Sequence, residues 1–163
     1  MAVNKPTNYH EEQKKQNILK MREILDTLPH FCKDYFRGIE HYTSARTRLA
    51  YAYDLRVFFE FMHKNNPECS KLEITEFPIT LLDQITRSDI LEYLDYVSYY
   101  KKEDLDITNE ERGKSRKISS LRSFYRYFYE NEMIKSNPAA LVPVPKLHEK
   151  EIIRLEPNEV AIL

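Results

Sequence analysis

The feature that most limits the fold of this chain is its shortage of glycine. Only Gly38 and Gly113 occur in 163 residues. Tight hairpin turns need positive φ angles, and glycine adopts them at the least steric cost. A sheet built from many hairpins would need more glycines than this sequence has. We therefore expect an all-α fold, a small bundle of four to five helices.

Composition indicates one globular domain. Hydrophobic residues make up 42% of the chain and charged residues 31%, which is enough apolar surface to offset the entropy lost on folding. No apolar run approaches the ~20 residues that span a bilayer, and the polar start MAVNKPTNYHEEQKKQ has no signal-peptide core. Cys32 and Cys69 are too few for a disulfide framework. We expect no membrane segment, reduced thiols and a cytoplasmic location.

The N-terminal half shows three apolar patterns at helical spacing. Residues 11–28 form an amphipathic helix that ends at proline. A short helix follows over residues 31–38, and we expect Gly38 to close it in the left-handed conformation. Thr43 or Ser44 caps a helix that runs to about residue 63. The apolar face of this third helix contains Tyr51, Leu55, Phe58, Phe59 and Met62.

The C-terminal half shows two helix-start signals. Thr86 and Asp89 have the spacing of a capping box, for a helix reaching about residue 100. After a short charged segment, Thr108 and Glu111 offer a second box, for a helix reaching about residue 131. Asn-Pro at 137–138 starts a brief helical turn. The buried stripe of the second helix contains Ile118, Leu121, Phe124, Tyr125 and Phe128.

Prolines mark the irregular segments and the expected end of the domain. Two prolines among mixed polar residues predict a loop over residues 65–79. The stiff run PVPKLHEKE predicts an inter-domain linker, and the residues after it look like the start of a truncated domain. We therefore expect an N-terminal extension helix over residues 1–30, a core domain over residues 31–142, and a linker with this truncated start over residues 143–163.

The distribution of charge indicates a polyanionic ligand, although the net charge of −1 is not typical of a nucleic-acid binder. From Lys114 to Arg126 the chain has five basic residues and no acidic one. On a helix, Arg116, Arg122 and Arg126 fall with three serines opposite the apolar stripe. Solvated faces usually interleave glutamate with basic residues, and this one does not. The pattern suits the major groove of DNA; the alternative is an ordinary solvated face.

Three stretches resemble the N-terminal core-binding domain of the tyrosine recombinases, also called phage integrases. They are SARTRLAYAYDLRVFFEFM from Ser44, SRKISSLRSFYRYFYENEMIKSNPAALV from Ser115, and the linker PVPK. The first stretch has Ser44, Thr47, Tyr51, Asp54 and Leu55 in the family's spacing. Together the stretches cover about residues 31–146. The resemblance implies a SAM-like helical bundle that forms half of a clamp around duplex DNA, with two helices facing the major groove.

The resemblance also implies site residues and what this chain lacks. The implied DNA contacts are Ser44, Arg46, Thr47, Tyr51, Lys114, Arg116, Lys117, Ser119, Arg122 and Arg126. The family's chemistry resides in a second domain, with a His-x-x-Arg pair and a late tyrosine. No histidine of this chain is followed three residues later by arginine. We therefore expect this chain to have no catalytic residues and to bind no cofactor or metal. We expect the fragment to be a monomer and the parent protein to form a homo-tetramer on DNA.

Other interpretations stay open from the residues alone. A helical protein-interaction module without DNA affinity is the main alternative, because the net charge is near zero and residues 89–100 are rich in tyrosine. Those tyrosines are more typical of core and rim packing than of base stacking. His30 and Cys32 lack a second pair at zinc-site spacing. The carboxylates of residues 103–111 have no evident base or nucleophile, so they predict a solvated loop.

Overall fold

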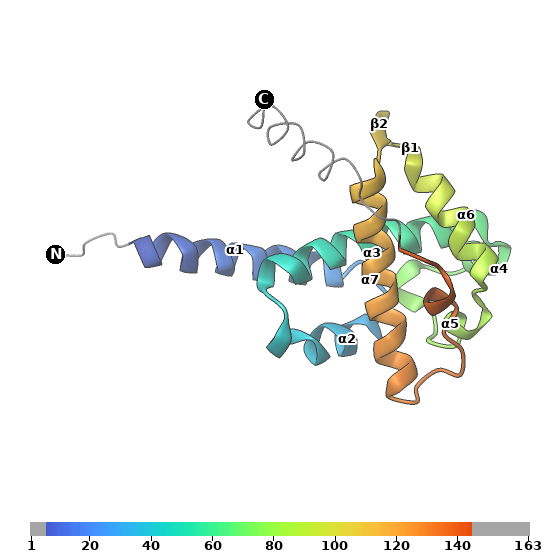
Figure 1. Cartoon of the computed structure of the whole chain (residues 1–163), viewed down its shortest axis with the longest axis horizontal. Coiled ribbons are helices and arrows are strands. Elements are labelled where there is room, and N and C mark those ends of the chain that lie inside the picture. Colours follow the sequence, from blue (N-terminus) through green and yellow to red (C-terminus); the bar gives the residue numbers. More distant parts are fainter. Residues whose placement is uncertain (1–5, 145–163) are drawn as a thin grey trace, which may run out of the picture.

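Four long helices make most of the fold in the computed structural model, which describes residues 6–144. They are α1 (Pro6–Leu25), α3 (Ala45–Asn65), α6 (Arg87–Ser98) and α7 (Glu111–Glu130). Helix α7 crosses α3, and the N-terminal part of α1 projects from the body of the molecule (Figure 1). The expected all-α fold is confirmed. No described helix is both long enough and apolar enough to cross a membrane.

Short elements connect these helices. They are α2 (Cys32–Gly38), η1 (Glu40–Tyr42), α4 (Pro67–Ser70), η2 (Ile74–Glu76), α5 (Leu81–Gln84) and η3 (Pro138–Leu141). The prediction of a plain loop over residues 65–79 is thus wrong in part. Helix α4 forms there because Asn66 accepts hydrogen bonds from the backbone amides of Glu68 and Cys69 at 2.9 and 3.3 Å, with proline at the first helical position.

Helix caps follow the sequence signals in three places. The Ser44 hydroxyl accepts from the backbone N–H of Thr47 at 3.1 Å and starts α3. Thr86 and Asp89 form the predicted reciprocal capping box of α6. Asn137 caps η3. At the N-terminus, α1 covers Pro6–Leu25, so it starts and ends earlier than the predicted residues 11–28. The backbone amides of residues 26–28 donate to carbonyls at the end of α1 and form a turn there.

A small β-hairpin replaces the charged loop that was predicted before α7. Strands β1 (Tyr99–Lys102) and β2 (Leu105–Thr108) pair antiparallel. Their turn uses Glu103 and Asp104 at φ angles of 51° and 68°, so two non-glycine residues supply the conformation for which glycine was thought necessary. Thr108 lies in β2, and α7 starts after Glu110 with no side-chain cap. The predicted Thr108–Glu111 capping box is therefore wrong.

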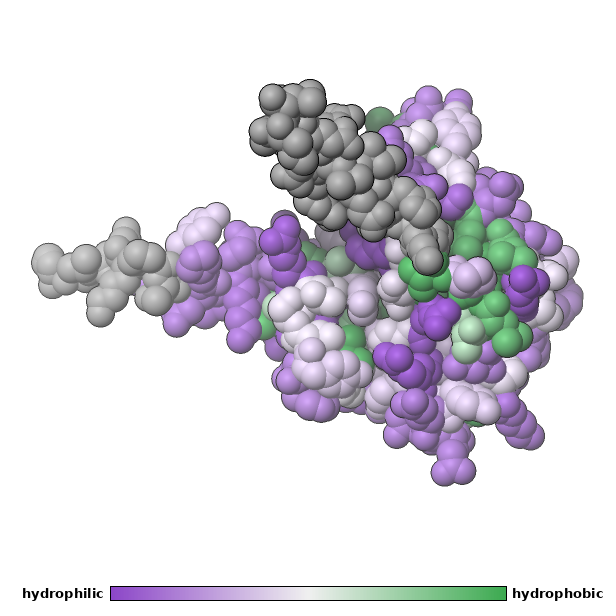
Figure 2. Space-filling model, viewed as in Figure 1, coloured by the Kyte–Doolittle hydropathy of each residue, from purple (hydrophilic) through white to green (hydrophobic). Residues whose placement is uncertain are grey.

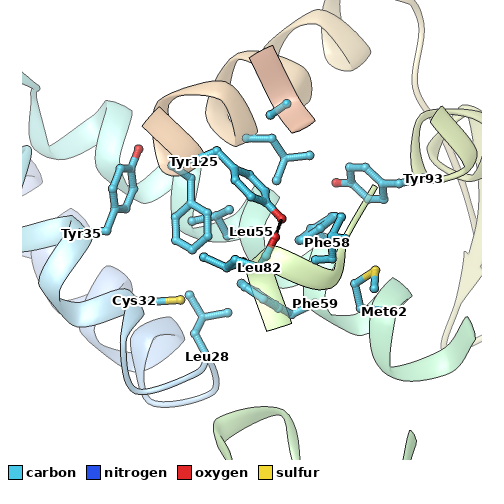
Figure 3. Close-up of a cluster of buried hydrophobic side chains, with 14 of the residues drawn as sticks. Leu28, Cys32, Tyr35, Leu55, Phe58, Phe59, Met62, Leu82, Tyr93 and Tyr125 are labelled. Atoms are coloured by element: carbon cyan, nitrogen blue, oxygen red, sulfur yellow. Dashed lines mark hydrogen bonds between the residues drawn. The ribbon is translucent and has the colours of Figure 1, made fainter. Parts of the chain in front are cut away.

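An aromatic core joins α2, α3 and α7 (Figure 3). Phe124 lies edge-on to Phe59 and Tyr35, with ring centroids 6.0 and 5.1 Å apart. The Tyr125 hydroxyl donates to the carbonyl of Leu82 at 2.9 Å and so ties α7 to α5. The predicted stripe of α7 is buried at every position. Edge-to-face aromatic pairs stabilise the core beyond the burial of apolar area and favour one relative orientation of the rings.

Gly38 is needed for space and not for a left-handed cap. No described glycine has a positive φ, so the predicted left-handed conformation of Gly38 is wrong. A Cβ at Gly38 would instead overlap the ring of Tyr127. That ring is held by the Tyr127 hydroxyl, which donates to Asp34 Oδ2 at 3.1 Å. Gly38 therefore lets α2 and α7 pack closely.

We predict that Gly38→Ala destabilises the fold by about 1 kcal/mol, because overlap with Tyr127 outweighs the better helix propensity of alanine. Urea unfolding measures this change. In a Tyr127→Ala background the same substitution should be neutral or stabilising, because the obstacle is gone. Equal destabilisation in both backgrounds would show that the overlap is not the cause.

Asp83 fastens the segment after α7 to α5. Its Oδ1 accepts from the backbone amides of Lys135 and Ser136 at 2.8 and 2.9 Å and from the Ser136 hydroxyl at 3.1 Å. Partial desolvation alone would raise the pKa of Asp83, but these hydrogen bonds outweigh it and the pKa is lowered. Folding therefore favours the ionised carboxylate.

We predict that Asp83 stabilises the protein above the unfolded pKa of about 4 and that this contribution is lost as the pH falls through its lower folded pKa. The measurement is the urea-unfolding free energy of the wild type and of Asp83→Asn from about pH 6 to pH 3. The difference between the two should shrink toward low pH. A difference independent of pH would contradict the assignment.

Candidate nucleic-acid interface

Helix α7 has one buried and one accessible face. The buried face contains the apolar stripe together with Lys117. The accessible face centres on Ser119 and carries Arg126, while Arg116 and Arg122 lie at its two edges. Arg116 and Arg126 are exposed; Ser119 and Arg122 are partly exposed. We call these four residues the outward face of α7.

The buried carboxylate of Asp54 joins α3 to α7. Arg116 donates to it twice, from Nε to Oδ2 at 2.9 Å and from Nη2 to Oδ1 at 2.7 Å. Lys117 Nζ lies 3.3 Å from Oδ1 of the same carboxylate. Asp54 and Lys117 are 2% and 7% exposed, whereas Arg116 is 51% exposed. The hydrogen bonds that Arg116 donates to Asp54 raise the pKa of Arg116.

This cluster corrects one expectation from the sequence. The basic run was expected to lack an acidic partner within the protein, but the single carboxylate of Asp54 pairs with two of its five basic residues. The periodicity of α7 cannot reveal this partner, because Asp54 lies on another helix. Lys117 also donates to Asn109 Oδ1 at 3.4 Å and points into the protein. The structure therefore separates Lys117 from the other predicted contacts.

Tyr35 joins α2 to α7 through Ser123. Its buried ring projects from α2, and its hydroxyl lies 2.8 Å from Ser123 Oγ. Burial raises the pKa of Tyr35, and Tyr51 and Arg126 are near enough to add smaller electrostatic effects. Thr47 lies one helical turn before Tyr51 on the same side of α3. Two predicted residues of α3 thus lie on the side of the outward face.

Ser44 and Arg46, the other two predicted contacts at the start of α3, lie apart from the contact of Tyr35 with α7. Arg46 is rotated by about 100° from Thr47 around the helix axis. With Ser44 it lines a groove of about 1180 Å³ against α1 and α2. Arg48 is buried, and its Nη1 donates to the carbonyls of Glu40 and Thr43, so it serves the turn before α3. Lys114, in the first turn of α7, is partly exposed.

Two arginines hold the backbone at the end of the described chain. Arg122 Nη1 donates to the carbonyl of Val142 at 2.7 Å, and Arg87 Nε donates to that of Leu141 at 3.4 Å. Arg122 is thus fixed at one edge of the outward face, as Arg116 is fixed by Asp54 at the other edge.

The sequence prediction missed two residues that bear on the outward face of α7: the buried Asp54, which pairs with Arg116, and the exposed Arg112. Asp54 matched the family spacing but was given no role. Arg112 is exposed and lies four residues before Arg116 on the same side of α7. The four-residue spacing from Arg116 could have predicted that Arg112 belongs to the same basic face. The glutamates at positions 110 and 111 made this part of the chain look acidic. Among residues 6–144, no group of three or more His, Cys, Asp or Glu side chains is placed to hold a metal ion.

We predict that Asp54→Ala costs about 3 kcal/mol, because the substitution leaves the buried Lys117 ammonium without its carboxylate. Urea unfolding tests this loss. Adding Lys117→Met should recover much of it, since an apolar side chain of similar length needs no partner. No recovery in the double variant would mean that the cost arises from Arg116 or from the cavity.

Comparison with known proteins agrees with this architecture. Residues 33–132 match the family described as "Phage integrase, N-terminal SAM-like domain". The chain is similar to proteins named Tyrosine recombinase XerC, with 32% identity to that of Caldanaerobacter subterraneus subsp. tengcongensis over 77% of this chain and 36% of the relative. Identity is 37% to that of Leptospira interrogans, over 69% of this chain and 30% of the relative.

The chain spans about a third of the length of these relatives. No solved structure gives a significant match. The matched residues cover more than half of the chain and include all of α3, α6 and α7. The chain therefore belongs to the family of phage integrase N-terminal SAM-like domains.

Proposed function

We propose that this chain binds duplex DNA as the DNA-binding domain of a site-specific tyrosine recombinase. The observation that carries the proposal is the outward face of α7, on which Arg116, Arg122 and Arg126 accompany serine hydroxyls with no acidic side chain between them. The name shared by the similar proteins, tyrosine recombinase, supports the same role.

The geometry of α7 suits the major groove. Its 20 residues correspond to a rod about 30 Å long, and the groove is about 12 Å wide and accepts one helix. Thr47 and Tyr51 extend the contact surface along α3, and Lys114 borders it in the first turn of α7. Ser44 and Arg46 line the groove against α1 and α2 and would reach DNA only beyond this surface. Lys117 is left out of the proposed surface, because its ammonium is buried against Asp54.

The proposal extends to the parent protein. Clamping of DNA by this domain would serve integration or recombination chemistry performed by a catalytic domain beyond these residues. The chain itself would bind without cutting, because it has no His-x-x-Arg pair. We further propose that it is monomeric and cytoplasmic, and that the parent assembles as a tetramer on DNA.

We predict a strong salt dependence of duplex binding. Arg122 and Arg126 with Lys114 offer three phosphate contacts, so log K against log salt should fall with a slope of about −3. Fluorescence anisotropy with a labelled duplex measures this slope. Binding that does not respond to salt, or no binding at low salt, would contradict the proposal.

A paired substitution locates the surface. We expect Arg126→Ala to lower the affinity for every duplex and to reduce the slope by about 0.9, because Arg126 makes no hydrogen bond or ion pair with residues 6–144 and its loss should leave the fold intact. Lys71→Ala, which removes an exposed lysine just after α4, is the matched control and should change neither quantity. Equal effects of the two would place the interface elsewhere.

A protein-interaction module remains the second candidate, favoured by one observation. Exposed apolar side chains gather over α6 and η3 (Figure 2); Leu91, Leu141 and Val144 are 38%, 65% and 40% exposed. The tyrosines that first motivated this candidate give less support, because Tyr93 is buried and Tyr96 stacks on Tyr100 with ring centroids 5.0 Å apart. A stoichiometric protein partner without any duplex shift at low salt would decide in its favour.

A further inference from the structure

The way Asp54 holds Arg116 leaves one edge of the guanidinium available. An arginine side chain has five N–H donors in a rigid plane. Asp54 uses one on Nε and one on Nη2. Three donors remain, and two of them, the second donor of Nη2 and one donor of Nη1, form the end edge of the group. Arg116 is 51% exposed, so this edge is accessible to a ligand.

Asp54 also fixes the plane of that guanidinium. The carboxylate is 2% exposed and receives Lys117 as well as Arg116. Because both oxygens of Asp54 are bound, its own orientation is restricted, and the bidentate pair transmits this restriction to Arg116. A side chain held in this way loses little conformational entropy when it binds a ligand.

The same pairing makes Arg116 a weaker phosphate neutraliser than its neighbour. Asp54 offsets the charge of Arg116, whereas Arg126 has no acidic partner among residues 6–144. A fixed pair of donors with an offset charge suits a ligand that is recognised by the position of its acceptors. Among base edges in the major groove, guanine alone presents two acceptors, O6 and N7, side by side.

We propose that Arg116 reads a guanine in the major groove and that Asp54 is its positioning residue. This inference rests on the proposed DNA binding and adds a specificity determinant to it. Arg116 lies in the second turn of α7, the part of a helix that reaches base edges most easily in helix-in-groove complexes. Arg126, two to three turns further on, contacts the phosphate backbone.

The test is selection from a library of randomised duplexes by the full 163-residue chain. The wild type should enrich guanine at one position by about 10-fold or more over the other bases. Arg116→Ala removes the donors that would face O6 and N7, so guanine enrichment at that position should disappear. Arg126→Ala is the matched control, which should lower affinity for all sequences and keep the guanine.

Asp54→Asn tests the positioning role. It should reduce the guanine enrichment although Arg116 is present, because an amide offers only one acceptor to the fork. Since Asp54 is buried, this variant is also made with Lys117→Met, which removes the unpaired ammonium. The double variant should unfold at a higher urea concentration than Asp54→Asn alone and should still lack the guanine preference. Recovery of the preference together with stability would overturn the positioning role.

The outcomes separate this inference from the proposed function. If the wild type binds no duplex at low salt, both are overturned. If it binds duplexes with no guanine preference, or if Arg116→Ala keeps the preference, only the inference is overturned and DNA binding stands.

Discussion

The carboxylate of Asp54 is the constraint on which the arrangement of α3 and α7 depends. It is 2% exposed, and a buried carboxylate is tolerated only with cations and hydrogen bonds around it. Both cations come from adjacent residues of α7, Arg116 and Lys117. This requirement sets how far α7 can slide or rotate against α3. Once that position is set, Phe124 faces the core and Arg126 faces outward.

Both glycines serve this packing by their small size. Gly38 gives room to the ring of Tyr127, and Gly113 gives room to Asn109, whose Oδ1 lies 2.7 Å from the place of a Cβ. Asn109 can then donate to the carbonyl of Val97 at 2.7 Å and accept from Lys117. Close approach of a neighbouring side chain, which glycine permits, therefore accounts for both positions.

Local patterns predicted the parts of the fold that depend on neighbouring residues. The stripe of α7 and the caps at Ser44 and Thr86 follow from helical spacing and from hydrogen bonds within one turn. The hairpin turn at Glu103 was missed, because non-glycine residues rarely adopt positive φ. The pairing of Asp54 with Arg116 was missed because it joins residues 62 positions apart. For the interface, spacing found the arginines of the outward face. It also puts Lys117 one turn before Leu121, on the buried side of α7, but it could not show that Asp54 is the partner of Lys117.

The hydrogen bonds from Arg122 to the carbonyl of Val142 and from Arg87 to the carbonyl of Leu141 have a mechanical consequence. The backbone at Val142 is fastened to α7 at the edge of its outward face, and the backbone at Leu141 is fastened to α6. A rotation of α7 about its axis would therefore pull on Val142, and a pull on the chain at that point would turn the helix. Torque can pass in both directions between the arginine-bearing surface and the backbone at Val142.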